Sequence, residues 1–405
     1  MSFLLAGVTT TIGPQGYGLL GRLTYGDLFI AAMLASIVIF IVPANRWKVY
    51  LSEPYLWFII LLLVFLFSAV FALNNQKSTI EIVVHLFIFL YSLALVQLYV
   101  NIISKPMVDD AVSAAILGAS FLAIYGIVIL FLFPDRNVVE GGLAGSFRNT
   151  GQAGSYFLTM SAIAIPAILS GVFKASLRNW LLVGVIILAL IFTGKRASLI
   201  GFFVGIVGLL LFMIKHLDDK KNRKMASVFL GVAMLTPFVV LYLILWGVDN
   251  VEGLSWRLEA KFTADGLDKF YTDFWSSNLQ GAIEAFNSNP LIGVGLGNVL
   301  GEFHEFEIHS TYAAVLATAG ILGVGVLFGF LVSLYKEIKA NGFQNKYDKF
   351  LCYFMPFFLG LMVSWSYTYT LRKREFWLMI FLITIIKMKS RAEAYRQNHR
   401  SAYRS

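Results

Sequence analysis

The sequence predicts an all-α, polytopic membrane protein with about 11 or 12 transmembrane helices and one long external loop that contains short amphipathic helices. Hydrophobic residues make up 58% of the 405 residues and charged residues only 14%. A soluble domain is nearer about a quarter charged. Apolar runs of about 20 residues, the length that crosses a bilayer, recur along the chain. One connection between these runs, 248–308, is much longer than the others.

The apolar runs place the individual spans, and the polar stretches between them place the loops. The first 20 residues carry no charge but are interrupted by Gly13 and Pro14, so they predict a short or broken first span. Within the long connection, 254–264 and 271–287 have amphipathic helical patterns. The remaining predicted spans are 25–43, 53–73, 79–103, 108–133, 152–172, 177–193, 196–216, 225–247, 309–335, 349–370 and 374–388.

These spans divide the chain into an N-terminal transmembrane bundle (1–247), a large external loop (248–308), C-terminal transmembrane helices (309–390) and a basic cytoplasmic tail (391–405). Cytoplasmic loops are enriched in Lys and Arg, which is why the basic C-terminus is placed inside. Alternating the spans back from there puts 20 of the 32 basic residues inside and 12 outside. The same topology places the long loop and His309 on the external face.

The external basic residues lie on the side of the membrane where Lys and Arg are less common, and they are therefore candidates for function. Lys195 and Arg196 are the clearest, because they interrupt a nearly continuous apolar stretch, LIFTGKRASLIGFF. A charge at membrane depth costs at least about 2.5 kcal/mol. The alternative, a short hairpin whose charges simply reach the headgroups, stays open. The full external set is Arg22, Lys77, Arg136, Arg148, Lys195, Arg196, Arg257, Lys261, Lys269, Arg372, Lys373 and Arg374.

Three predicted spans begin at the external surface beside a basic or titratable side chain. Arg148 precedes the span near Gln152, and Arg196 and His309 each begin a span. A helix N-terminus carries partial positive charge and free N–H groups, and an arginine binds phosphate oxygens in pairs. The sequence therefore predicts an anion site at the outer headgroup level, whose natural ligand is a lipid-linked phosphate or diphosphate.

His309 lies where a polar, glycine-rich stretch meets a long apolar helix. A helix N-terminus disfavours the protonated imidazole, which keeps the ring neutral and able to accept a proton. Ser310 is positioned to cap the helix. Gly320, about three turns on, and Ala313 would let a neighbouring helix pack closely below His309. The alternative is a histidine that is simply hydrogen-bonded at the interface.

Several other functions are not favoured. The run HEFEIH spaces its histidines five apart, whereas a zinc-protease helix needs them four apart, so no metal and no cofactor are predicted. The loop GVGLGN (293–298) faces outward, where nucleotides are scarce, so it predicts a turn with close backbone approach. Membrane orientation explains most of the net charge of +9, so no nucleic-acid partner is predicted. The lone cysteine, Cys352, allows no internal disulfide.

Four motifs together resemble the O-antigen ligase and O-antigen polymerase superfamily of bacterial inner-membrane glycosyltransferases. The resemblance covers residues 25–390, with the motifs in the family's order and topology. The motifs are GSFRNTGQAGSYF (145–157), similar to the segment G-x-F-x-N-x-N that opens a middle span; Lys195-Arg196 in a tight outer hairpin; NPLIGVGLGN (289–298), similar to PLxGxGxGN; and His309-Ser310 followed after nine residues by Gly320 and Gly323.

The chain departs from the family pattern at two positions. Family members carry an arginine in the helix that leads to the PLxG turn, and this position falls near Trp275, in a segment without basic residues. Arg257 or Lys261 is the candidate to replace it. A family asparagine is also replaced near Gln152.

The resemblance implies metal-independent transfer of a glycan from a polyprenyl-diphosphate carrier to an acceptor hydroxyl, on the periplasmic face of the inner membrane. The acceptor is lipid A-core in the ligase branch, a second lipid-linked repeat unit in the polymerase branch, and a protein hydroxyl in a further branch. In this interpretation His309 and Arg196 are catalytic, while Lys195, Arg148, Arg257 and Lys261 bind the diphosphate or glycan. The competing class is a transporter or flippase of the same lipid-linked oligosaccharide.

Overall fold

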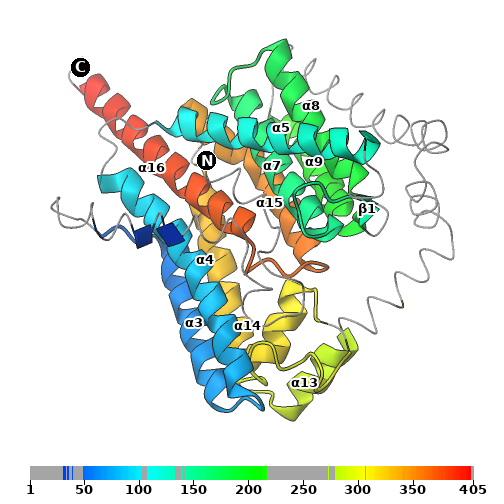
Figure 1. Ribbon diagram of the computed structural model, residues 1–405. Coiled ribbons are helices and arrows are strands. Elements are labelled where there is room, and N and C mark those ends of the chain that lie inside the picture. The colour runs from blue at the N-terminus through cyan, green and yellow to red at the C-terminus, as the bar shows by residue number, and fades with distance from the viewer. Residues whose placement is uncertain are drawn as a thin grey trace. The chain divides into compact units, whose positions relative to one another are not determined.

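The computed structural model describes residues 31–32, 34–35, 39, 49–101, 107–132, 138–139, 142–216, 272, 279–305, 307–340 and 342–402. Within these ranges the chain is built from ten named helices and one small hairpin of two-residue strands (Figure 1). The elements are α3 (Glu53–Val70), α4 (Asn75–Asn101), α5 (Val108–Leu132), β1 (Val138–Val139), β2 (Gly142–Leu143), α7 (Thr150–Ser170), α8 (Leu177–Phe192), α9 (Arg196–His216), α13 (Gly281–Ser288), α14 (Thr311–Ile338), α15 (Lys346–Trp365) and α16 (Arg374–Ala402).

Six of the described helices, α3, α4, α5, α7, α9 and α14, are long and apolar enough to cross a membrane. Helix α8 is also apolar but has only 16 residues. The prediction of an all-α polytopic membrane protein is confirmed. The predicted first span, most of 25–43, the span 225–247 and the amphipathic helix 254–264 lie outside the described residues.

The described helices start close to the predicted spans. Helices α3, α5, α8 and α9 begin at the predicted residues. Helix α15 begins three residues early, because the Asn345 side chain caps it by accepting hydrogen bonds from the backbone nitrogens of Tyr347 and Asp348, each at 2.9 Å. Helix α16 continues to Ala402, well beyond 388, and residues 389–402 include three alanines and three arginines, which favour helix.

The chain forms two compact units, and each interleaves distant parts of the sequence. Unit 1 comprises 1–29, 109–267 and 340–364, and unit 2 comprises 30–108, 268–339 and 365–405. Unit 1 therefore holds α5, α7, α8, α9 and α15, and unit 2 holds α3, α4, α13, α14 and α16. The four regions predicted from the sequence were defined by the side of the membrane, whereas the two units are defined by packing. The division into four regions therefore stays a prediction.

In unit 1, α7 is almost entirely buried: 18 of its 21 residues are buried. Helices α9 and α15 approach each other backbone to backbone. A Cβ atom added to Gly360 would lie 2.1 Å from the Gly201 carbonyl oxygen, so both positions require glycine for this contact.

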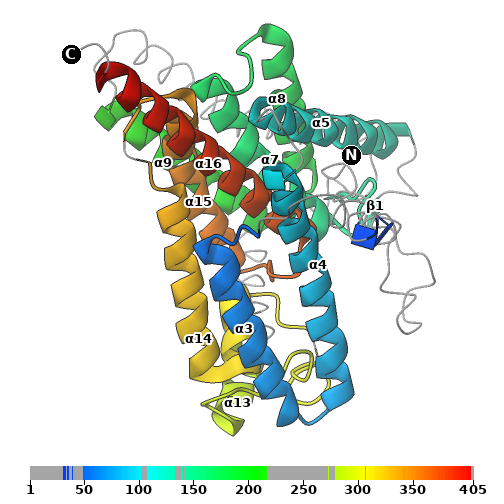
Figure 2. The same ribbon diagram turned by 90° about the vertical axis from the view of Figure 1, so that its left-hand side faces the viewer.

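In unit 2, aromatic side chains hold α3, α4, α14 and α16 together around the fully buried Trp377. Its ring centroid lies 4.4 Å from that of Phe58 on α3, 5.4 Å from Phe89 on α4 and 6.4 Å from Phe330 on α14. The Ser92 hydroxyl adds a hydrogen bond to the Trp377 carbonyl oxygen at 2.7 Å. Figure 2 shows α3 between α4 and the long helix α14.

Helix α14 is broken at Gly320, whose backbone angles are φ 60° and ψ −156°. This conformation is essentially restricted to glycine. It divides α14 into an N-terminal half, Thr311–Ala319, and a C-terminal half, Ile321–Ile338. The residue that was predicted to admit a neighbouring helix instead admits a loop, because an added Cβ would lie 2.6 Å from the carbonyl oxygens of Pro290 and Leu291.

The glycine loop (Asn289–Asn298) satisfies the backbone groups that the break releases. A continuous helix would pair Ile321 N with Ala317 O and Leu322 N with Thr318 O. Instead, the two nitrogens donate to the carbonyl oxygens of Pro290, at 2.9 Å, and Leu291, at 3.3 Å. The two oxygens accept from the backbone nitrogens of the loop's Val294 and Gly295, both at 3.0 Å. Two helical hydrogen bonds are thus replaced by four to the glycine loop.

The far end of the glycine loop is fixed to the turn between α3 and α4 by Asn298, which is fully buried. Its amide nitrogen donates to Ser78 Oγ at 2.7 Å, and its amide oxygen accepts from the backbone nitrogen of Asn74 at 2.9 Å. Glycines 293, 295 and 297 all have φ between 71° and 84°, so the predicted turn with close backbone approach is confirmed.

Candidate functional site

In unit 1, Arg148 lies directly before the N-terminus of α7 and its side chain is exposed. The next residue, Asn149, caps the helix, because its side-chain oxygen accepts a hydrogen bond from the backbone nitrogen of Gln152 at 2.9 Å. Arg196 is the first residue of α9 and is half-buried. The predicted position of both arginines at helix N-termini is therefore confirmed.

A tight turn of three residues, 193–195, joins α8 to α9 and brings Lys195 against the first turns of α7. A Cβ atom added to Gly154 of α7 would lie 3.1 Å from Lys195 Cβ and 2.9 Å from Ser198 Oγ. One added to Gly151 would lie 3.7 Å from Lys195 Cε. Small residues on α7 thus let the α8–α9 turn lie close to the capped end of α7, and unit 1 gathers two helix N-termini beside Lys195.

In unit 2, His309 lies two residues before α14 and is exposed. Ser310 is the N-cap residue of α14, and its hydroxyl oxygen accepts a hydrogen bond from the backbone nitrogen of Ala313 at 3.3 Å, so the predicted cap is confirmed. Exposure alternates over the four residues 307–310, with Glu307 and His309 exposed while Ile308 and Ser310 are buried.

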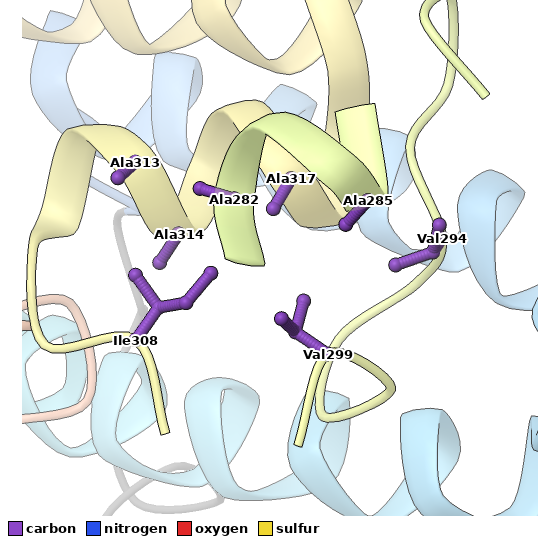
Figure 3. Packing of buried hydrophobic residues seen from close by; sticks show 8 residues of the cluster. All are labelled: Ala282, Ala285, Val294, Val299, Ile308, Ala313, Ala314 and Ala317. Carbon is purple, nitrogen blue, oxygen red and sulfur yellow. The ribbon is translucent and has the colours of Figure 1, made fainter. Parts of the chain in front are cut away.

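A cluster of buried apolar side chains includes Ile308 and so anchors the segment 307–310 (Figure 3). Alanines on α13 and α14 allow the two helices to pack closely, as predicted for Ala313. Figure 3 shows the side chains of Ile308 and Val299 pointing toward these alanines. His309 therefore follows a residue that is anchored in a packed core. The cluster consists of Ala282, Ala285, Val294, Val299, Ile308, Ala313, Ala314 and Ala317.

Arg372, in the α15–α16 loop (Ser366–Lys373), connects two carboxylates of unit 2. Its Nη2 atom lies 2.7 Å from both carboxylate oxygens of Glu307, and its Nη1 atom lies 3.6 Å from Glu81 Oε2. Burial alone would lower the pKa of Arg372, but the charges of Glu307 and Glu81 raise it above the usual arginine value. The guanidinium therefore remains charged.

His85 and Tyr369 form a second, partly buried contact beside Arg372. His85 Nδ1 lies 2.7 Å from the Glu81 carbonyl oxygen, and His85 Nε2 lies 2.7 Å from the Tyr369 hydroxyl. A carbonyl oxygen can only accept, so in the neutral ring Nδ1 donates and Nε2 accepts from Tyr369. Burial raises the pKa of Tyr369, which keeps its hydroxyl protonated and able to donate.

Sequence reasoning did not select Glu81, His85, Tyr369 or Arg372 as site residues. Arg372 was identified only as one of 12 external basic residues. One signal in the sequence could have pointed to Arg372. Glu307 is an acidic residue two positions before His309, and it would be expected to pair with a basic side chain. That partner lies 65 residues away in sequence.

The structure describes four of the six predicted site residues. Arg148, Lys195 and Arg196 belong to unit 1, and His309 belongs to unit 2. Their meeting in one site stays a prediction. Arg257 and Lys261, like the position near Trp275, lie outside the described residues. Within the described ranges, no three His, Cys, Asp or Glu residues are grouped so that they could hold a metal ion.

The comparison with known proteins gives one family match. A family model described as O-antigen ligase matches residues 181–328. This range contains Lys195, Arg196 and His309, the glycine loop and Gly320. No curated protein matches the chain. The match supports the superfamily that the four sequence motifs resemble.

Proposed function

We propose that this chain, a member of the O-antigen ligase and polymerase superfamily, is a membrane glycosyltransferase that moves a glycan from a polyprenyl-diphosphate carrier to an acceptor hydroxyl. The observation that carries the proposal is the family match over 181–328, because both candidate catalytic residues, Arg196 and His309, fall inside it. Several apolar helices that are long enough to span a membrane support a lipid-linked substrate.

In the proposed reaction, the acceptor oxygen attacks the anomeric carbon of the donor sugar. The bond between this carbon and the diphosphate oxygen breaks, and the polyprenyl diphosphate leaves with the bonding electrons. The acceptor proton passes to the His309 imidazole, which acts as general base. Arg196 and Lys195 stabilise the negative charge that develops on the diphosphate, with Arg148 as a further anion contact. Direct attack inverts the anomeric configuration.

The exposed position of His309 favours this role, because an acceptor can reach its ring. Two helix N-termini beside Lys195 favour the anion-binding role of unit 1. We place the reaction on the periplasmic face of the bacterial inner membrane, with the C-terminus in the cytoplasm, on the basis of the Lys and Arg distribution. The acceptor is a glycan in a polymerase, lipid A-core in a ligase and a protein hydroxyl in an oligosaccharyltransferase.

The activity can be tested with the full chain reconstituted in liposomes together with undecaprenyl-diphosphate-linked oligosaccharide. Separate reactions would contain lipid A-core, more of the lipid-linked glycan, or an acceptor protein. We expect a product of higher mass on gels in one of these reactions, and we expect unchanged activity after EDTA treatment. Loss of activity in EDTA that Mg²⁺ or Mn²⁺ restores would contradict the metal-independent mechanism.

Replacing Arg196 with alanine should lower kcat about 100-fold to 1000-fold, as expected for a group that stabilises developing charge. Arg196→Lys should recover only part of this loss, because an ammonium keeps the charge but not the planar fork. The matched control is Arg178→Ala, an exposed arginine near the N-terminus of α8 in the same unit. Equal kcat in Arg196→Ala and Arg178→Ala would contradict the role of Arg196.

The competing function is a transporter of the same lipid-linked anion, and the broken helix α14 is the observation that favours it. Transporters bind substrates and ions at discontinuous helices through their free backbone groups. In α14, however, the groups on both sides of Gly320 are hydrogen-bonded to the glycine loop. Protected transfer of a fluorescent lipid-linked glycan across liposomes, without any glycosidic product, would favour the transporter.

A further inference from the structure

The segment that carries His309, Glu307–Ser310, lies directly before α14 and is neither helix nor strand. Its alternating exposure shows that Glu307 and His309 lie on one side of an extended chain, while Ile308 and Ser310 lie on the other. Ile308 and Ser310 attach the buried side to the α13–α14 core and to the start of α14. On the exposed side, the Glu307 carboxylate offers an attachment point two residues from His309.

Arg372 binds the Glu307 carboxylate. Its Nη2 atom, 2.7 Å from both oxygens of Glu307, forms a charge-assisted contact at normal hydrogen-bond distance. The other terminal nitrogen of the guanidinium, Nη1, lies 3.6 Å from Oε2 of Glu81 on α4, whose side chain is only 11% exposed. Because α4 is a long helix packed in the core of unit 2, Arg372 links the exposed side of the segment to a rigid element.

The α15–α16 loop that carries Arg372 is itself fixed at several points. Thr311 Oγ1 donates to the Thr368 carbonyl oxygen at 2.6 Å and accepts from the Thr370 backbone nitrogen at 3.0 Å. The Tyr369 hydroxyl donates to the buried His85, and the Arg372 guanidinium carbon lies 5.6 Å from the centre of the Tyr369 ring. The guanidinium therefore has few alternative positions, which reduces the entropy cost of holding Glu307.

We propose that Arg372 and Glu307 are positioning residues that set the place of His309, with Tyr369 and His85 holding Arg372 in turn. This inference rests on the proposed catalytic role of His309. A displacement of about 1 Å can lower a rate about 100-fold, so a pair that fixes the neighbouring residue controls kcat without contacting substrate. The pair acts on the turnover step and leaves donor binding, which is assigned to unit 1, nearly unchanged.

Whether the Arg372–Glu307 pair fixes the segment that carries His309 can be tested independently of activity, by hydrogen–deuterium exchange of the full chain in nanodiscs. Arg372→Gln and Glu307→Gln should each speed exchange in peptides covering 305–313 by about fivefold, the effect of a modest loss of local stability. The control is Lys336→Gln, which removes the exposed ion pair between Lys336 and Glu53 at the other end of α14 and should leave these peptides unchanged. Unchanged exchange in both pair variants would overturn the inference.

The kinetic part uses the glycan-transfer assay. Each single variant should lower kcat about tenfold with the KM for the lipid-linked donor within about twofold. The double variant Arg372→Gln with Glu307→Gln should lower kcat no further than either single variant, because both substitutions break the same contact. A raised KM with normal kcat, or losses of kcat that add up in the double variant, would contradict positioning.

The two proposals fail in different ways. If His309→Ala retains full activity, the proposed role of His309 is wrong, whatever the exchange data show. If His309→Ala is inactive while Arg372→Gln and Glu307→Gln keep wild-type kcat, the role of His309 stands and the positioning inference is wrong.

Discussion

Replacing His309 with alanine should lower the rate of glycan transfer about 100-fold to 10,000-fold, because the acceptor hydroxyl would lose its general base. The loss should appear in kcat measured at saturating lipid-linked donor, using the reconstituted protein and a gel assay of the product. His309 is exposed, so the substitution removes little packing, and an unchanged melting temperature would show that the fold is retained. Unfolding would therefore not explain the loss.

A suitable control is His216→Ala, which removes an exposed imidazole from the end of α9. It should retain normal kcat, and both variants should keep the wild-type melting temperature in detergent. His309→Gln tests the chemistry more closely, because glutamine can hydrogen-bond to the acceptor but cannot accept its proton at neutral pH. Wild-type turnover in His309→Gln would show that the ring orients the acceptor without taking its proton.

Replacing Gly320 with alanine should destabilise the protein severely. The backbone at Gly320 has positive φ, which costs an L-residue about 1–3 kcal/mol. The new methyl group would also lie 2.6 Å from three backbone atoms of Pro290 and Leu291, so the glycine loop would have to leave the break. We expect the melting temperature in detergent to fall by about 5 °C or more, with loss of transfer activity.

The matched control lies five residues along the same helix. Gly325 has no atoms within 4 Å of an added Cβ, and its backbone is helical. Gly325→Ala should leave the melting temperature unchanged or raise it, because alanine favours helix by about 1 kcal/mol over glycine. If Gly320→Ala and Gly325→Ala have the same melting temperature, the break at Gly320 does not require glycine.

The sequence predicted the helices well because apolar runs of membrane length have few alternative structures. It also located the ends of α7, α9 and α14 beside Arg148, Arg196 and His309, since caps and charges mark helix starts. The cap at Ser310 and the turn formed by residues 293–298 were readable from local residue types alone. These features depend on interactions within a few residues of one another.

The break at Gly320 was not predictable in the same way. Within an apolar helix, a glycine usually marks close helix packing, and its backbone angles are set here by the glycine loop, about 30 residues earlier. The Arg372–Glu307 pair depends on a contact between the α15–α16 loop and the start of α14. Both features require long-range contacts that a single sequence does not specify. The two motifs around 289–298 and 309–323, which look separate in sequence, are the two sides of one helix break.

The break at Gly320 also bears on how much of α14 would be needed to cross a bilayer. All 28 residues of α14 would form a straight helix about 42 Å long, more than the hydrocarbon core of about 30 Å. The 18 residues from Ile321 to Ile338 already span about 27 Å, enough to cross most of that core. The nine residues from Thr311 to Ala319 are then available to lie among the headgroups. His309, two residues before this half, would then lie near the membrane surface, where the proposed lipid-anchored diphosphate donor and a water-borne acceptor hydroxyl can meet.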